Sequence, residues 1–379
     1  MEFSFTAEQI ELKTQISQFA QTMNDATIEN DREQAFSREK WARCAELKLH
    51  GLQVPLEYGG SGHSMLTAVI AMEAFGYGCR DNGLGFALNA QMLVQLPIIH
   101  HGSEKQRGDW LPGMANGTKI GAFAFTEPEN GSDLLGMKAR AVKVPGGYRL
   151  NGEKALITCG PIADFAIVFA STNPDLGSWG LTAFVVELAR EGVEVGDNQE
   201  KMGLRTVPFG SLRFNDCYVG EDEVLGKEGA GFGILNRALE WDRCCVLATQ
   251  LGAMERMLED CVAYSRQREQ FGKPIGQFQS VSNRIADMKL RLEGSRLLLY
   301  KAAWASDQGK SAALDAALSK LSLSESFVAS SFDAVRIHGG KGYLVDEGIE
   351  RFVRDSLGGV IYGGTSDVQR VTIAKLLGL

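Results

Sequence analysis

The stretch Gly121–Asp133, GAFAFTEPENGSD, constrains the fold of this chain more than any other. It begins as a short apolar strand and stops at Glu127-Pro128 and Asn130-Gly131, which are both turn signals. A second predicted strand pair, YRLNGEK followed by ALITCG, occupies residues 148–160. Taken alone, strands joined by such polar turns predict a β-meander.

Alternating apolar and polar residues continue through the middle of the chain, where Gly, Pro and Asn-Asp separate the runs. The runs are Ala122–Phe125, Tyr148–Leu150, Ala166–Ala170, Thr182–Val186 and Ser211–Phe214. Together they predict a small antiparallel β-domain, either a sandwich or an open barrel.

Helical periodicity occupies both sides of this middle segment. Thr6 and Gln9 form a capping box before an apolar series at helical spacing, and Ser103 with Glu104 predicts another helix start. In the third segment we expect helices over 236–268, 279–306 and 312–339. A final helix is expected to be capped by Ser366 and Gln369.

The predicted fold class is therefore α+β, with an N-terminal helical domain, a central antiparallel β-domain and a C-terminal four-helix bundle. We place the domains at 1–118, 119–226 and 227–379. A chain of 379 residues is long enough for two or three domains.

Composition limits the partners and the compartment. A hydrophobic content of 44% is ordinary for a soluble globular protein, and a net charge of −8 argues against nucleic acid as the main partner. The seven scattered cysteines form no CxxC pair, and the N-terminus shows no signal or transit segment. We expect a cytoplasmic protein with no membrane span. The five histidines show no metal-ligand spacing, so no metal is expected.

The predicted strands also suit a flavin. An isoalloxazine ring carries one N–H and several acceptors along its rim, and strand backbone supplies complementary groups at matching spacing. A hydroxyl such as that of Thr158 can reach the ring nitrogen that receives hydride. The two interpretations, β-meander and flavin site, remain open on this stretch alone.

Three further motifs follow the first one in order: FGKPIGQFQ at 271–279, IHGGKGY at 337–343 and IYGGTSDVQR at 361–370. With Gly121–Asp133 they resemble the acyl-CoA dehydrogenase family over essentially the whole chain. The resemblance implies FAD as cofactor, placed between the β-domain and the C-terminal bundle, and a homotetramer built as a dimer of dimers.

The resemblance also implies which residues hold FAD. On the flavin ring it places Phe123, Phe125, Thr126, Ile157 and Thr158. On the pyrophosphate and adenosine it places Arg268, Phe271, Gln279, Arg336, Gly339, Gly340, Thr365 and Asp367, the first three across a subunit interface.

Three positions depart from the residues usual in the family. Leu156 stands where most members have Trp, Arg336 where Gln is usual, and Asp367 where Glu or Gln is usual. We expect FAD binding to survive these changes, with a wider pocket at Leu156 and altered phosphate contacts at Arg336.

The catalytic base of most family members is also missing. Their Tyr-Glu-Gly-Thr reads Tyr362-Gly363-Gly364-Thr365 here, so the carboxylate is absent while the Gly363 N–H that helps to hold the thioester carbonyl remains. The isovaleryl-type branch carries its base on the long helix, directly before an arginine. The matching pair is Asp242-Arg243, which makes Asp242 the candidate base.

A helical wheel places Arg243 near the middle of the apolar stripe and Asp242 at its edge. A charged pair on a buried face is costly unless it is paired or used in chemistry. Glu240, three residues before Arg243, is a candidate partner for that arginine. A purely structural ion pair is the alternative. Ser132, Arg243, Tyr362 and Gly364 are the expected substrate-binding residues.

The expected function is FAD-dependent α,β-dehydrogenation of an acyl thioester, carried on CoA or on a carrier protein. Branched or cyclic aminoacyl groups such as prolyl are compatible with the base position. An electron-transfer flavoprotein or O2 is the expected electron acceptor. Two alternatives remain: a flavin-binding protein of this fold without dehydrogenase activity, and a flavin oxidase or monooxygenase.

Overall fold

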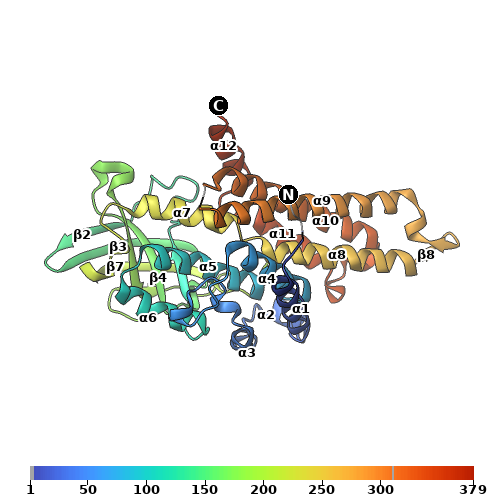
Figure 1. Ribbon diagram of the computed structural model, residues 1–379, viewed down its shortest axis with the longest axis horizontal. Coiled ribbons are helices and arrows are strands. Elements are labelled where there is room, and N and C mark those ends of the chain that lie inside the picture. The colour runs from blue at the N-terminus through green and yellow to red at the C-terminus, as the bar shows by residue number, and fades with distance from the viewer. Residues whose placement is uncertain (1–3, 310) are drawn as a thin grey trace.

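The computed structural model describes residues 4–309 and 311–379 and shows a helical segment, a sheet and a second helical segment in chain order. Figure 1 shows the sheet at one end of an elongated molecule, with the long C-terminal helices running away from it. The N-terminal helices lie along one long side of the molecule, next to the place where the sheet meets the C-terminal helices.

Six helices precede the sheet. They are α1 (Ala7–Gln21), α2 (Thr27–Glu33), α3 (Arg38–Arg43), α4 (Met65–Gly78), α5 (Asn82–His101) and α6 (Glu104–Ala115). The expected capping boxes are present: Thr6 caps α1 with Gln9, and Ser103 caps α6 with Gln106. Helices α4 and α5 are buried over most of their length, so they form the centre of the core rather than its cover.

The sheet is mixed, which corrects the expectation of an antiparallel domain. Its strands are β1 (Gly121–Ala124), β2 (Arg140–Val144), β3 (Gly147–Thr158), β4 (Phe165–Ser171), β5 (Leu181–Glu187), β6 (Val193–Val195) and β7 (Phe209–Gly220). The order is β1-β4-β2-β3-β7-β6, with β5 on β4. Strand β4 pairs in parallel with β1 and β2. All seven residues of β4 are buried, as is typical of a strand at the centre of a sheet.

Residues 148–160 were expected to form two strands, and this expectation was wrong. Strand β3 is continuous from Gly147 to Thr158 and pairs with β7. The pairing shifts register between Leu150 and Gly152 and again between Lys154 and Ile157. Such irregularities bend a strand without ending it, and the sequence pattern of a bent strand looks like two short ones.

After the sheet come α7 (Gly231–Arg243), α8 (Ala248–Gln267), the two-residue strands β8 (Glu269–Gln270) and β9 (Lys273–Pro274), α9 (Gln279–Asp307), α10 (Ala313–His338), α11 (Glu350–Gly359) and α12 (Ser366–Leu376). The two predicted helices that correspond to α9 and α10 are confirmed within one residue at each end. The helices α8, α9 and α10 run alongside one another to the end marked by β8 (Figure 1).

The single helix expected over 236–268 is instead two helices, separated at residues 244–247. The break is held by a tertiary contact, because the buried side-chain amide of Asn89 on α5 donates to the carbonyl of Val246 (3.1 Å). A carbonyl released from a helix needs such a partner when it is buried. Within the part of the chain described, no helix is long and apolar enough to cross a membrane.

Candidate active site

Asp242 lies in the last turn of α7 and is only 3% exposed. Burial raises the pKa of its carboxyl group to about 7, while the positive charges of Arg243 and Lys320 act in the opposite direction. A carboxylate with a pKa near neutrality is suited to accept a proton from a weakly acidic C–H group. The wheel had placed Arg243 deeper than Asp242, but Asp242 is buried and Arg243 is half-buried, with its side chain extended to the Gly363 carbonyl.

The turn between α11 and α12 faces this carboxylate. Gly363 has φ = 63° and Gly364 has φ = 87°, values at which a side chain would be strained. A Cβ atom on Gly363 would lie 3.2 Å from Oδ2 of Asp242. The fold therefore brings together Gly363, where most family members carry the base, and Asp242, the candidate base of this chain.

Three side chains from three helices fix the carbonyl groups of this turn. The Nε of Arg243 donates to the Gly363 oxygen (3.0 Å), and the Nζ of Lys320 on α10 donates to the Gly364 oxygen (2.7 Å). The Nε2 of Gln369 on α12 donates to both oxygens, at 3.2 and 3.1 Å. Fixing these carbonyls also fixes the directions of the Gly364 and Thr365 N–H groups, which lie in the same peptide planes.

These contacts correct two expectations. Gln369 does not form a capping box with Ser366, since the cap of α12 is Thr365, which accepts from the Val368 N–H. Glu240 does not pair with Arg243 but with Arg237 (2.7 Å), and it also accepts from the backbone of Ala312.

Lys320 was missed by the sequence analysis, although a signal existed. The segment ALSKLSLSESF places this lysine among small and apolar residues, and its side chain is fully buried. A lysine on the buried face of a helix is rare unless it has a partner. The sequence pattern could not show its hydrogen-bond partner, which is the Gly364 carbonyl, 44 residues away in the chain.

Tyr362 closes one side of the turn. Its ring packs against Phe86 of α5, with centroids 4.6 Å apart, and its hydroxyl accepts a hydrogen bond from Gln250 of α8. Helix α5 also holds the start of β1, because the amide of Gln91 bonds to both the N–H and the carbonyl of Gly121. One helix thus links the Asp242 region to the sheet.

The expected flavin-ring residues lie together in the sheet. Phe123 is on β1, Phe125 and Thr126 follow it, and Ile157 and Thr158 end β3. The Ala155 N–H donates to the Thr126 carbonyl (2.9 Å), which joins the two segments. The expected substrate residue Ser132 is exposed in the loop that follows.

A buried ion pair supports this part of the sheet. Lys154 on β3 contacts Glu127 at 2.8 Å, and both side chains are almost completely buried. Glu127 also accepts from the backbone N–H groups of Lys138 and Ala139.

Next to this pair Leu156 has φ = 60° and is 56% exposed. An apolar side chain held outward beside Phe125 and Thr126 fits the face of a planar ring, so these residues are compatible with a flavin.

The remaining expected FAD residues lie elsewhere. Arg268, Phe271, Gln279, Arg336, Gly339 and Gly340 are exposed near the β8 end of the long helices, with Phe271 at 94% exposure. Figure 1 shows this end opposite the sheet. Arg336 bonds to Asp333 (3.2 Å). Thr365 and the exposed Asp367 are instead at the start of α12, beside the Gly363 turn. A single chain therefore does not bring the ring residues and the residues of the β8 end together.

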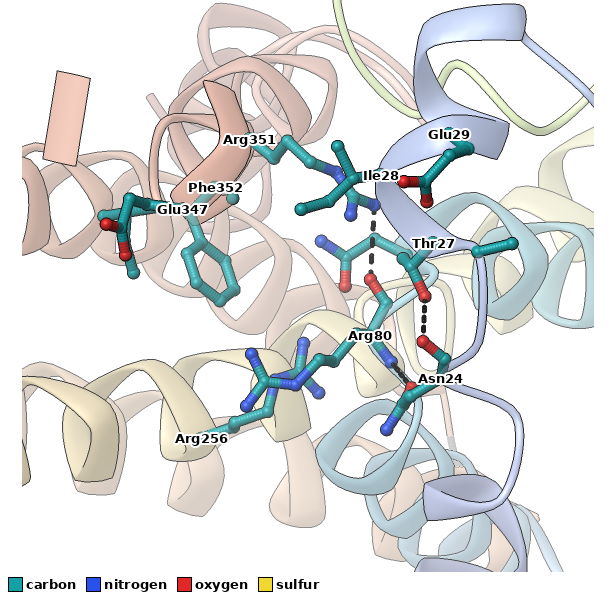
Figure 2. A pocket seen from close by; sticks show the side chains of 13 residues that line it. Asn24, Thr27, Ile28, Glu29, Arg80, Arg256, Glu347, Arg351 and Phe352 are labelled. Carbon is teal, nitrogen blue, oxygen red and sulfur yellow. Dashed lines mark hydrogen bonds between the residues drawn. The ribbon is translucent and has the colours of Figure 1, made fainter. Parts of the chain in front are cut away.

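A cavity of about 210 Å³ lies outside this site, between the α1–α2 connection, α8 and α11 (Figure 2). Its buried arginines serve the fold. Arg256 donates to the carbonyls of Gly76, Tyr77 and Cys79 at the end of α4, and Arg351 donates to the Arg80 carbonyl. Among the residues that the structure describes, no cluster of His, Cys, Asp and Glu could hold a metal ion.

The fold and the site together define a class of protein, in which a sheet and two helical segments surround a buried carboxylate suited to proton abstraction. The family models for the N-terminal, middle and C-terminal domains of acyl-CoA dehydrogenases match residues 6–118, 122–217 and 229–378. The chain belongs to the acyl-CoA dehydrogenase family.

Three similar proteins match nearly the whole chain. An L-prolyl-[peptidyl-carrier protein] dehydrogenase of Pseudomonas fluorescens is 46% identical over 356 residues, which are 93% of this chain and 94% of that protein. The crystal structure of the prolyl acyl carrier protein oxidase AnaB has a TM-score of 0.97 at 42% identity, with 99% of this chain and 100% of that chain covered. PigA with FAD and proline has a TM-score of 0.98 at 38% identity, with both chains fully covered.

Proposed function

We propose that this protein is an FAD-dependent dehydrogenase that desaturates the Cα–Cβ bond of an acyl thioester, with Asp242 as the base. The observation that carries the proposal is the buried Asp242 carboxylate, with a pKa of about 7, directly opposite the Gly363 turn. The family to which the chain belongs supports the reaction class.

The chemistry divides between the two sides of the substrate. FAD, when bound, accepts the hydride from Cβ. Asp242 removes the proton from Cα, and the Gly363 N–H donates to the thioester carbonyl, where negative charge develops. The hydrogen bonds from Arg243, Lys320 and Gln369 hold the Gly363 and Gly364 carbonyls and so restrain the turn that directly follows this N–H.

Phe123, Phe125, Thr126, Ile157 and Thr158 would hold the flavin ring. We propose that the phosphate and adenosine portions bind Thr365 and Asp367 of the same chain. Arg268, Phe271, Gln279, Arg336, Gly339 and Gly340 would come from a second copy. The separation of the two sets in one chain supports this assignment.

A homotetramer, built as a dimer of dimers, would supply that second copy. Helix α9 carries Leu290, Leu297 and Trp304 at intervals of seven residues, and they are 73%, 53% and 50% exposed. Apolar residues at this spacing lie on one face of a helix, and such an exposed stripe is typical of an interface.

We propose a prolyl group on a carrier protein as the substrate, because the similar proteins act on prolyl carrier proteins. An acyl-CoA is the alternative. The electron acceptor is either an electron-transfer flavoprotein or O2, and Leu156, which is smaller than the Trp usual in the family, would leave more room beside the ring for O2. A cytoplasmic location would suit the seven unbridged cysteines.

The test is anaerobic flavin bleaching. The purified protein should be yellow, and its extracted cofactor should be FAD rather than FMN. Prolyl carrier protein should bleach the flavin faster than prolyl-CoA or a straight-chain acyl-CoA, and air should then be compared with an electron-transfer flavoprotein for reoxidation. If no thioester bleaches the flavin, the protein is instead a binding subunit or a monooxygenase, and the dehydrogenase proposal fails.

A further inference from the structure

We propose that Lys320 is a positioning residue of this site: its ammonium group holds the Gly364 carbonyl and, through its charge, keeps the neighbouring Asp242 in the carboxylate form. Naming Asp242 as the base rests on the proposed function. The electrostatic link between Lys320 and Asp242 does not, and it can be measured separately.

The geometry places Lys320 and Asp242 beside the same residue, Gly363. Lys320 comes from α10 and Asp242 from α7. A Cβ atom on Gly363 would lie 3.2 Å from Oδ2 of Asp242 and 3.9 Å from Cε of Lys320. The ammonium group itself donates to the next carbonyl, that of Gly364, at 2.7 Å. The Asp242 carboxylate and the end of the Lys320 side chain therefore lie within 4 Å of the same point beside Gly363.

Among the described residues neither side chain forms a salt bridge, although Arg243 also acts on Asp242. The hydrogen-bond acceptor of Lys320 is a neutral carbonyl, and the carboxylates that act on it are Asp242 and, with a smaller effect, Glu325. Burial lowers the pKa of Lys320 to about 8, and Arg243 acts in the same direction, so the ammonium form still predominates at neutral pH. A buried charge without a hydrogen-bonded or charged neighbour would be strongly destabilising.

Arg243 is the other cation that acts on Asp242, and its effect is the larger of the two. It follows Asp242 on the same helix and directs its Nε to the Gly363 carbonyl. From the turn, Tyr362 is uncharged, because burial and the nearby Asp242 raise its pKa well above the usual value. Cys244 and Cys245 come next in the chain, and burial raises their thiol pKa values, so both are neutral. Of the cations that act on Asp242, Lys320 is the one that comes from another helix.

Loss of the ammonium charge should therefore raise the pKa of Asp242. Removing an opposite charge beside a carboxylate typically changes its pKa by about 1–3 units. Since the pKa of Asp242 is about 7, the variant would be largely protonated at neutral pH and unable to accept a proton. A purely structural lysine would leave this pKa unchanged and would lower activity equally at every pH.

The experiment titrates Asp242 directly in the FAD-loaded protein. The infrared band of the protonated carboxyl group is recorded against pH and identified by its loss in Asp242→Asn. Lys320→Gln removes the charge and keeps an N–H donor. Lys320→Met removes both the charge and the donor, and Lys320→Arg keeps both. Lys301→Met is the matched control, because this lysine is exposed on α9 and pairs only with Asp315 in the described structure.

We expect the titration midpoint of Lys320→Gln to rise by about 1–3 units, while Lys320→Arg and Lys301→Met stay near the wild type. If Lys320→Met folds, it should shift like Lys320→Gln. The acid limb of the rate of flavin reduction should move by the same amount, with the rate recovering at high pH. A Lys320→Gln midpoint equal to the wild-type midpoint would overturn the proposal. A midpoint that shifts in a protein that no thioester reduces would support the Lys320 link and reject the dehydrogenase function.

Discussion

At the scale of single residues, the glycine at position 363, where most family members have glutamate, determines which element can supply the catalytic base. A Cβ on Gly363 would come within 3.2 Å of the Asp242 carboxylate, so the two positions compete for one space. A carboxylate from the turn and one from α7 are therefore alternative ways to reach the same point. This relation explains why the absence of glutamate at Gly363 does not by itself indicate an inactive protein.

The first prediction concerns Asp242→Asn. The amide is nearly isosteric, so the fold and FAD content should be retained, whereas flavin reduction by substrate should fall by at least about 10²–10⁴-fold, the usual contribution of a general base. In the wild type the rate should rise with pH through about 7, because only the deprotonated carboxyl group accepts a proton. Stopped-flow absorbance of the flavin measures both effects.

Glu240→Gln is the control for this prediction, because Glu240 pairs with Arg237 and lies outside the Gly363 turn. It should reduce flavin at nearly the wild-type rate. Gly363→Glu in the Asp242→Asn background should restore part of the rate, within the limit set by the strain of a side chain at φ = 63°. Wild-type rates in Asp242→Asn would show that the base is another residue.

At the scale of elements, the irregular strand β3 combines two tasks. Its register shift between Lys154 and Ile157 turns Leu156 outward while Lys154 points inward to Glu127. Glu127 in turn accepts the N–H groups of Lys138 and Ala139, so the buried pair ties the turn after β1 to the entrance of β2. The expected ring residues depend on this support.

We expect Lys154→Met to destabilise the protein by about 3–5 kcal/mol, because it leaves the Glu127 carboxylate buried without its counter-charge. The matched control is Lys138→Met in the same region, where the pair with Glu129 is exposed and worth about 0–1 kcal/mol. Urea denaturation followed by circular dichroism compares the two. Equal midpoints would mean that the buried pair contributes no more than the exposed one.

At the scale of the whole molecule, the two ends carry different parts of one proposed cofactor site. The sheet lies at one end and the exposed residues near β8 at the other (Figure 1). Arg268 directly follows α8, and its side chain is exposed, as expected of a residue that serves a neighbouring copy. Cofactor binding and assembly should therefore depend on each other.

Arg268→Ala should lower both FAD affinity and subunit association. The loss of a charge-assisted phosphate contact is worth about 1.5–3 kcal/mol, or roughly a 10- to 100-fold weaker affinity. Arg266→Ala is the control, since Arg266 is exposed two residues earlier on the same helix. Sedimentation and flavin absorbance measure assembly and cofactor content. A monomeric Arg268→Ala protein with full FAD content would contradict the interface assignment.

The sequence by itself determined the helix–sheet–helix order and the spans of α9 and α10, which follow from local periodicity and caps that act over a few residues. The candidates Asp242 and Gly363 came from the sequence through its resemblance to the acyl-CoA dehydrogenase family. The tertiary structure alone decided the break between α7 and α8, the parallel pairing of β4, and the place of Lys320 beside Asp242. Each of these depends on a partner distant in the chain, such as Asn89 for Val246 or Gly364 for Lys320, and periodicity carries no information about such partners.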